Sequence, residues 1–231
     1  MSSRPHISVV CCGLIGTTVG DGSGPESMIE RSFAEAIATQ GVVSGTSAFA
    51  RCMSQVSRSR GRSTPEIFDT LFPGNQARAQ AACLAFERSY RAAVQRTGLA
   101  LQPGASEAID KLTGSGIRTC LVSSLSRGML QFVLDAIGWR GRFDASLCPD
   151  DVPRGFPWPD LVITALLRLG AGDVREVAVA VGTEHGIQAG RRAGAELTVG
   201  VLTGPHTPAR LRKAGAAHLI GSVAELPDLV A

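Results

Sequence analysis

Apolar positions along the chain follow two different rhythms. Residues 7–12 are predicted to form a strand, in which Val9, Val10 and Cys11 make the unbroken apolar run typical of a strand buried on both faces. From about Met28 the apolar residues recur at helical spacing instead. The longest predicted helix runs from about Gln76 to Thr97 and ends at Gly98, a residue that commonly stops helices.

After Pro103-Gly104 the pattern alternates between helix and strand. The predicted helices cover 105–115, 129–138, 159–169, 188–193 and 208–214, and the predicted strands cover 119–123, 145–148, 177–181, 197–202 and 218–220. This alternation predicts a parallel sheet with helices on both faces. We therefore expect an α/β protein with a Rossmann-like core (1–21 and 101–231) and an inserted α-helical cap (22–100).

The ends of the predicted strands indicate where a ligand would bind. In open α/β sheets, ligands bind at the carboxyl ends of the strands. The loops that follow those ends are Gly13–Thr18, Ser123-Ser124, Asp150–Gly155 and Gly182–Gly186. We expect these loops to converge on one pocket.

Composition narrows the class of protein. The chain has 231 residues, a net charge of +3 and six cysteines, none in a CxxC or zinc-type spacing. No apolar run approaches the roughly 20 residues of a membrane span, and no signal peptide precedes the first strand. These features predict a reduced, cytoplasmic protein that binds neither membrane nor nucleic acid.

The basic residues are almost all arginine, because Lys111 and Lys213 are the only lysines. One local cluster contains four of the arginines: Arg51, Arg58, Arg60 and Arg62. This cluster either meets a phosphate group or belongs to a solvated loop, and the loop is the simpler interpretation. We keep Arg58 as a candidate ligand-binding residue.

The segment Ser8–Val19, an apolar strand followed by Gly16-Thr17-Thr18, resembles the opening of haloacid dehalogenase (HAD) phosphohydrolases of the phosphonatase-like branch. Further segments resemble the same group in the same order. They are 103–105, 116–118, 134–139, 150–155, 157–160, 189–194, 199–204 and 222–227. The resemblance covers nearly the whole chain and implies the HAD fold.

The resemblance also implies a catalytic apparatus of four parts: a nucleophilic Asp, a Ser or Thr, a Lys or Arg, and acidic ligands for Mg²⁺. In register, Ser123 preserves the second part. Gly13 stands at the nucleophile position and Phe156 at the Lys/Arg position, and Gly182–Gly186 contains no Asp. The Schiff-base Lys of true phosphonatases is absent too, since Ser57 stands at its position. We therefore expect no metal or other cofactor.

A pocket without these charges would be more neutral, with room left by Gly13 and Gly186 and an aromatic wall from Phe156. It would suit a larger, less charged organic molecule. The Thr and Ser hydroxyls of the loops would orient that ligand or cap the turns. The candidate substrate-binding residues are Gly13, Thr17, Thr18, Ser123, Ser124, Arg58, Phe156 and Arg154.

Three residues are candidates for catalysis. Glu184 and His185 lie at the expected mouth of the pocket and could exchange protons, unless they belong to an exposed surface loop. Cys12 stands one residue before the nucleophile position, and a thiolate there would be a good nucleophile, although its neighbours are apolar.

Three functions follow. The leading hypothesis is a repurposed, metal-independent enzyme that performs cyclisation, elimination or aldol-type chemistry on a biosynthetic intermediate. The alternative is a pseudoenzyme that binds a ligand or a partner without turnover, and the third is a phosphohydrolase with an unusual nucleophile. The expected partner is a small molecule, and a homodimer or a protein partner is left open.

Overall fold

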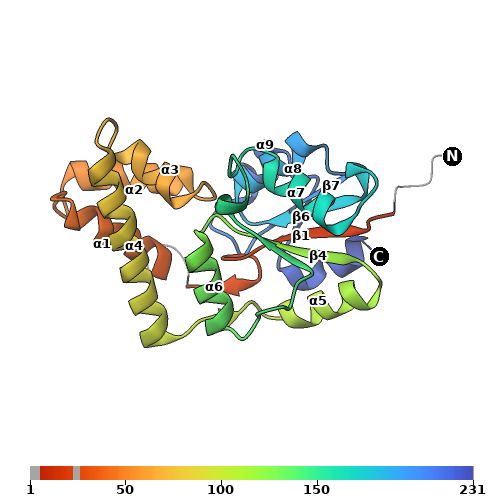
Figure 1. The fold of residues 1–231 in the computed structure, drawn as a ribbon. Coiled ribbons are helices and arrows are strands. Elements are labelled where there is room, and N and C mark those ends of the chain that lie inside the picture. Colours follow the sequence, from red (N-terminus) through yellow and green to blue (C-terminus); the bar gives the residue numbers. More distant parts are fainter. Residues whose placement is uncertain (1–5, 23–26, 231) are drawn as a thin grey trace.

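A six-stranded parallel sheet forms the centre of the protein in a computed structural model that describes residues 6–22 and 27–230 (Figure 1). The strand order is β5-β4-β1-β6-β7-β8, and every neighbouring pair is parallel. The strands are β1 (Val9–Gly13), β4 (Arg118–Val122), β5 (Ala145–Leu147), β6 (Val177–Val181), β7 (Leu197–Val201) and β8 (His218–Ile220). This arrangement agrees with the α/β architecture expected from the sequence.

Helices cover both faces of the sheet (Figure 1). On one face lie α5 (Ala105–Gly114), α6 (Arg127–Ala136) and α10 (Pro227–Val230), and on the other lie α7 (Asp160–Leu169), α8 (Glu184–Ala193) and α9 (Pro208–Ala214). Alternate β1 residues point to opposite faces, so Val10 and Cys12 join one core cluster while Val9 and Cys11 join the other. The apolar run of β1 is unbroken because both of its faces are buried.

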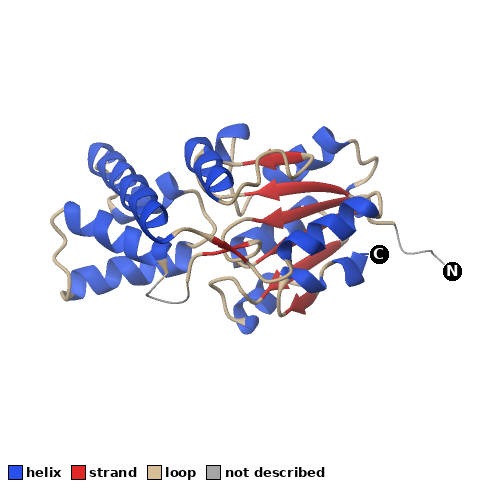
Figure 2. Cartoon of the chain, turned by 90° about the horizontal axis from the view of Figure 1, so that it is seen from below, coloured by secondary structure: helices blue, strands red, loops and turns tan. Residues whose placement is uncertain are grey.

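The remaining helices form a cap beside the carboxyl ends of the strands. They are α1 (Met28–Thr39), α2 (Ser47–Ser59), α3 (Thr64–Leu71) and α4 (Gln76–Thr97). Their centre is aromatic: the rings of Phe33 and Phe86 are 4.5 Å apart, and those of Phe33 and Phe68 are 5.4 Å apart. A two-stranded antiparallel ribbon, β2 (Val19–Gly20) and β3 (Ala100–Leu101), joins the cap to the core (Figure 2).

Many predicted bounds coincide with the observed ones, including those of α4, β6, α9 and β8. Helix α8 is an exception, because it begins at Glu184 and not at Gln188. Thr183 caps it, with its Oγ1 accepting a hydrogen bond from the Gly186 N–H at 3.3 Å. The expected short polar loop is therefore the first turn of a helix. Short 3₁₀ segments cover Pro149–Asp151, Val174–Glu176 and Val223–Glu225.

The six cysteines all lie in the described part of the chain and form no disulfide there. Among the described residues, no helix combines the length and apolar character that crossing a membrane requires. The cytoplasmic location stays a prediction.

Candidate functional site

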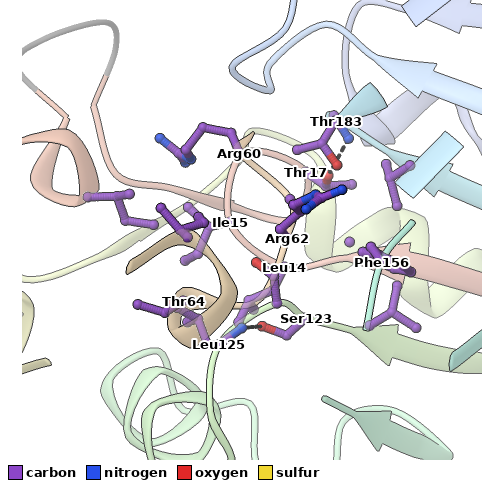
Figure 3. Close-up of a pocket in the computed structure, with 18 of the residues that line it drawn as sticks. Leu14, Ile15, Thr17, Arg60, Arg62, Thr64, Ser123, Leu125, Phe156 and Thr183 are labelled. Atoms are coloured by element: carbon purple, nitrogen blue, oxygen red, sulfur yellow. Dashed lines mark hydrogen bonds between the residues drawn. The ribbon is translucent and has the colours of Figure 1, made fainter. Parts of the chain in front are cut away.

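A cleft lies where the carboxyl edge of the sheet meets the cap, with an empty volume of about 630 Å³ that includes its open mouth (Figure 3). The loops after β1, β4 and β6 form its core side. The strand register aligns these loops, because Gly13 pairs with Val122 and Cys12 pairs with Ala180. The sequence predicted that four loops converge on one pocket. These three do, but no residue of the fourth, Asp150–Gly155, is among the described lining residues.

The polar side chains of the core side are all hydroxyls. Ser123 and Ser124 line the cleft after β4, and Thr17 and Thr183 line it near the ends of β1 and β6. Ser123 Oγ accepts a hydrogen bond from the Leu125 N–H at 3.1 Å (Figure 3). Its own hydroxyl hydrogen remains available to a ligand.

Thr17 fills the space beside Gly13. Its Oγ1 accepts a hydrogen bond from the Gly182 N–H at 3.2 Å, and a β-carbon on Gly13 would lie only 2.7 Å from that oxygen. The expectation that Gly13 leaves room is therefore wrong. It is wrong for Gly186 as well, where a β-carbon would lie 2.8 Å from a methyl of Val181, so this glycine serves the packing of α8 on β6.

Two arginines reach the cleft from the segment between α2 and α3. Arg60 Nη1 lies 2.5 Å from Glu30 Oε1, and both side chains are largely buried. Asp21 is buried near the same guanidinium, and burial raises the pKa of its carboxyl group. Arg60 thus enters the cleft wall with its charge already balanced by carboxylates behind it.

Arg62 is half-buried and lines the cleft, and its side chain makes no ion pair or hydrogen bond with the residues that the structure describes (Figure 3). Apart from Arg60, it is the only charged residue among the described lining residues, and no Asp or Glu is among them. The cleft therefore presents one uncompensated positive charge.

Apart from the two arginines and Thr64, the cap contributes apolar side chains to the cleft. They are Ile29 and Phe33 of α1, Ile67 of α3 and Phe86 of α4. Phe156 adds a second aromatic wall on the core side, as the sequence predicted.

Two of the three residues predicted to be catalytic are held by other partners and do not line the cleft. Glu184 accepts two hydrogen bonds from Arg210, at 2.7 and 3.0 Å, and this contact lowers the pKa of the carboxyl group. His185 is buried, with Nδ1 2.8 Å from the carbonyl oxygen of Arg60, and desolvation lowers the pKa of its ring. The exposed loop weighed as the alternative is not observed either.

The third, Cys12, is fully buried and also lies outside the lining. Burial raises the pKa of its thiol far above the usual range, which keeps the thiol protonated. Thr18 is fully buried as well, and its hydroxyl donates to the carbonyl oxygens of Gly13 and Leu14. Thr18 thus holds the turn after β1, which was the other interpretation of this residue.

Two predicted ligand-binding arginines point elsewhere. Arg58 is exposed on α2, and Arg154 pairs with Asp160 at 2.8 Å above the ring of Trp158. Neither lines the cleft. The basic cluster named from the sequence does reach the cleft, but through Arg60 and Arg62 and not through Arg58.

The lining residues do not fit the magnesium ion that the fold family implies. Mg²⁺ takes hard oxygen ligands, chiefly carboxylates, and the described lining offers hydroxyls and arginine instead. Nowhere among the described residues do three or more His, Cys, Asp or Glu side chains form a group that could hold a metal. The free charge of Arg62 would also repel a cation.

A family model described as haloacid dehalogenase-like hydrolase matches residues 17–194. The phosphonoacetaldehyde hydrolase of Hahella chejuensis is 32% identical over 152 residues, which cover 55% of this chain and 51% of that protein. The probable phosphatase IndB of Dickeya dadantii is 29% identical over 156 residues, 67% of this chain and 66% of that protein. This chain thus spans about half the length of the Hahella relative.

Solved structures share the fold over nearly the whole chain. A hydrolase from Pseudomonas syringae superimposes with a TM-score of 0.80 at 22% identity and covers 96% of this chain and 97% of its own. A phosphonoacetaldehyde hydrolase-like protein from Oleispira antarctica has the same TM-score and identity and covers 98% and 91%. The match extends through the cap as well as the core.

Proposed function

We propose that this chain, which belongs to the haloacid dehalogenase-like hydrolase family, binds a small molecule with an anionic group in its cleft. The protein does not hydrolyse that molecule through an aspartyl intermediate. The anionic group would be a phosphate, a phosphonate or a carboxylate. One observation carries the proposal: the free charge of Arg62 faces a cleft whose described lining contains no carboxylate.

The chemistry of the lining supports direct anion binding. A guanidinium group donates two parallel hydrogen bonds to the oxygens of a phosphate or carboxylate. The hydroxyls of Thr17, Ser123 and Ser124 supply further donors on the core side. Because no carboxylate repels the incoming anion, no bridging cation is needed. This proposal replaces the larger, less charged ligand expected from the sequence.

The lining offers no group for the usual chemistry of the family. Gly13 has no side chain, and the Cys12 thiol is buried and protonated. Lys111 lies on α5 and Lys213 on α9, and neither lines the cleft, so neither can form a Schiff base there. The positions of Glu184 and His185 favour the binding role over the repurposed enzyme.

A second candidate function is hydrolysis of a phosphonate or a phosphate ester. The similarity to phosphonoacetaldehyde hydrolases and to a probable phosphatase favours it. It would require water or a hydroxyl group as the nucleophile in place of a carboxylate.

Calorimetric titration with inorganic phosphate, in EDTA and again with Mg²⁺, tests the proposal. We expect binding that is independent of Mg²⁺ and that weakens roughly 10-fold or more in Arg62→Gln, because charged hydrogen bonds contribute about 1.5–3 kcal/mol each. Arg58→Gln, an exposed arginine of the same cluster, is the matched control and should bind like the wild type. Absence of binding, or equal loss in both variants, would refute the anion site.

Turnover is measured separately by phosphorus NMR with phenyl phosphate and with phosphonoacetaldehyde, whose carbonyl group can accept the electron pair of the broken C–P bond. We expect both compounds to remain intact. Protein-dependent release of phosphate that is lost in Arg62→Gln would establish the hydrolase instead.

A further inference from the structure

The two sides of the cleft differ in chemistry. The polar groups of the core side are hydroxyls, and Arg62 adds a positive charge from the segment between α2 and α3. The helices α1, α3 and α4 of the cap contribute Ile29, Phe33, Ile67 and Phe86, with Thr64 at the start of α3 as their one polar residue. A ligand whose anionic group lies on Arg62 and the core loops must therefore direct the rest of its body toward hydrocarbon.

The cap wall has little to offer a polar ligand group. Arg60 lines the cleft but is already bound to Glu30 at 2.5 Å, and Thr64, at the start of α3, supplies the one hydroxyl among the described residues of this wall. The aromatic side chains are packed against each other, with the Phe33 and Phe86 rings 4.5 Å apart, so they cannot readily turn aside for polar groups.

We propose that the ligand is amphipathic, with a phosphonate or phosphate head and a short alkyl or aryl body that packs against α1, α3 and α4. This inference rests on the anion site proposed above. Sugar phosphates and other hydroxylated anions bind weakly in this cleft, because their hydroxyls lose water against the cap wall without gaining partners.

The affinity then depends on chain length in a predictable way. Each methylene group that leaves water for an apolar wall strengthens binding about fourfold. A methyl group exchanged for a hydroxyl at the same position weakens binding by roughly fivefold or more. An added methyl group should therefore raise the affinity and an added hydroxyl group should not. A general effect of ligand size would change the affinity in the same direction for both.

Calorimetric titration of the wild-type protein in EDTA provides the test. The probes are methyl-, ethyl-, propyl- and phenylphosphonate, together with 2-hydroxyethylphosphonate, which has the shape of propylphosphonate with the terminal methyl replaced by hydroxyl. We expect affinity to rise along the alkyl series, and propylphosphonate to bind at least about fivefold more tightly than its hydroxyl analogue.

A variant locates the effect. Ile15, in the loop after β1, is half-buried and lines the cleft, and it packs against the hydrophobic cluster that contains Phe33 and Phe86 of the cap wall (Figure 3). Ile15→Thr should reduce the ratio of propyl- to methylphosphonate affinity at least about twofold while phosphate affinity is kept. Leu167→Thr, at a position 71% exposed on α7, should leave the ratio unchanged.

The outcomes separate the two proposals. If phosphate and methylphosphonate bind but the longer chains bind no more tightly, or the hydroxyl analogue binds best, the amphipathic ligand is refuted and the anion site stands. If neither phosphate nor any phosphonate binds, the anion site itself is refuted. An unchanged affinity ratio in a folded Ile15→Thr protein would exclude this residue's side of the cleft as the apolar subsite.

Discussion

The side chain of Thr17 couples position 17 to position 13. Its hydroxyl oxygen lies 2.7 Å from where a β-carbon on Gly13 would be, and it also accepts a hydrogen bond from the N–H of Gly182. Any side chain at position 13 must therefore displace Thr17 and weaken the contact between the loops after β1 and β6. Restoring an aspartate at position 13 would require a second change at position 17.

A double-mutant cycle tests this coupling. We expect Gly13→Ala to lower the free energy of unfolding by about 1–3 kcal/mol, because it overpacks a buried site whose backbone otherwise accepts alanine. Thr17→Ala should cost about 1 kcal/mol through the lost hydrogen bond. The double variant should cost less than the sum, by about 0.5–2 kcal/mol, as measured by urea denaturation.

Gly114→Ala is the matched control. A β-carbon there meets no atom within 4 Å, so this substitution at the end of α5 should be neutral or slightly stabilising. Strict additivity in the cycle would mean that Thr17 does not hold the space beside Gly13.

Single residues of the site were predicted well where a strand fixes them and poorly where a helix end does. Gly13 ends one buried strand and Ser123 follows another, so the pattern placed both at the pocket. Arg62 depends on where α2 ends, and the alternating Ser and Arg residues around Arg58 carry no apolar period that marks that end. The sequence pattern therefore could not show that Arg62, and not Arg58, lines the cleft.

At the scale of elements, two buried histidines join the core to the cap. His185, in the first turn of α8, contacts the carbonyl of Arg60. His206, between β7 and α9, lies with Nε2 3.4 Å from the carbonyl oxygen of Ser57 on α2, while its Nδ1 accepts the N–H of Glu184 at 2.8 Å. Because Nδ1 must accept that bond, His206 is held neutral.

Burial lowers the pKa of His206 to about 4, from a usual value of 6.5. Between these two values the unfolded chain binds a proton that the folded protein does not, so stability falls as the pH falls. The difference between the two pKa values corresponds to a decrease of up to about 3 kcal/mol in the free energy of unfolding. Denaturation at pH 7 and at pH 5 should show about 2 kcal/mol of this loss in the wild type, because pH 5 lies about 1.5 units below the usual pKa. The loss should be smaller in His206→Asn, whose amide oxygen can still accept the Glu184 N–H.

His218→Asn serves as the control, since His218 is exposed on β8, and it should keep the pH dependence of the wild type. If His206→Asn loses as much stability as the wild type between the two pH values, the buried ring of His206 is not the source of the effect.

Elements were predicted best where one signal dominates. Helix α4 has a long apolar stripe and a terminal glycine, and β6 is a run of Val and Ala, so both bounds were found from the sequence. The ribbon of β2 and β3 was missed, because two-residue strands have no period to read. Neither histidine contact was foreseeable, since both depend on how the cap docks against the core.

At the scale of the whole molecule, one hydrophobic cluster crosses from the sheet into the cap. It contains Val10 and Leu121 of the sheet together with Phe33 and Phe86 of the cap. A core that spans both parts favours unfolding in a single cooperative step.

Two optical probes can test this. Trp139 and Trp158, the only tryptophans, lie in the core, whereas circular dichroism reports the cap helices as well. We expect the fluorescence and circular dichroism transitions in urea to share one midpoint and one slope. Loss of helical signal at a lower urea concentration than the fluorescence change would show that the cap unfolds separately.

The central position of β1 has a consequence for the order of events during synthesis. Val9 pairs with Arg118 on one side and with Val177 on the other, and the strands that carry them are translated after the whole cap. At about 5–20 residues per second, β6 follows β1 by roughly 8–35 s. A nascent chain therefore carries an unpaired apolar strand while its cap helices are already complete, and that strand is the segment most in need of a chaperone.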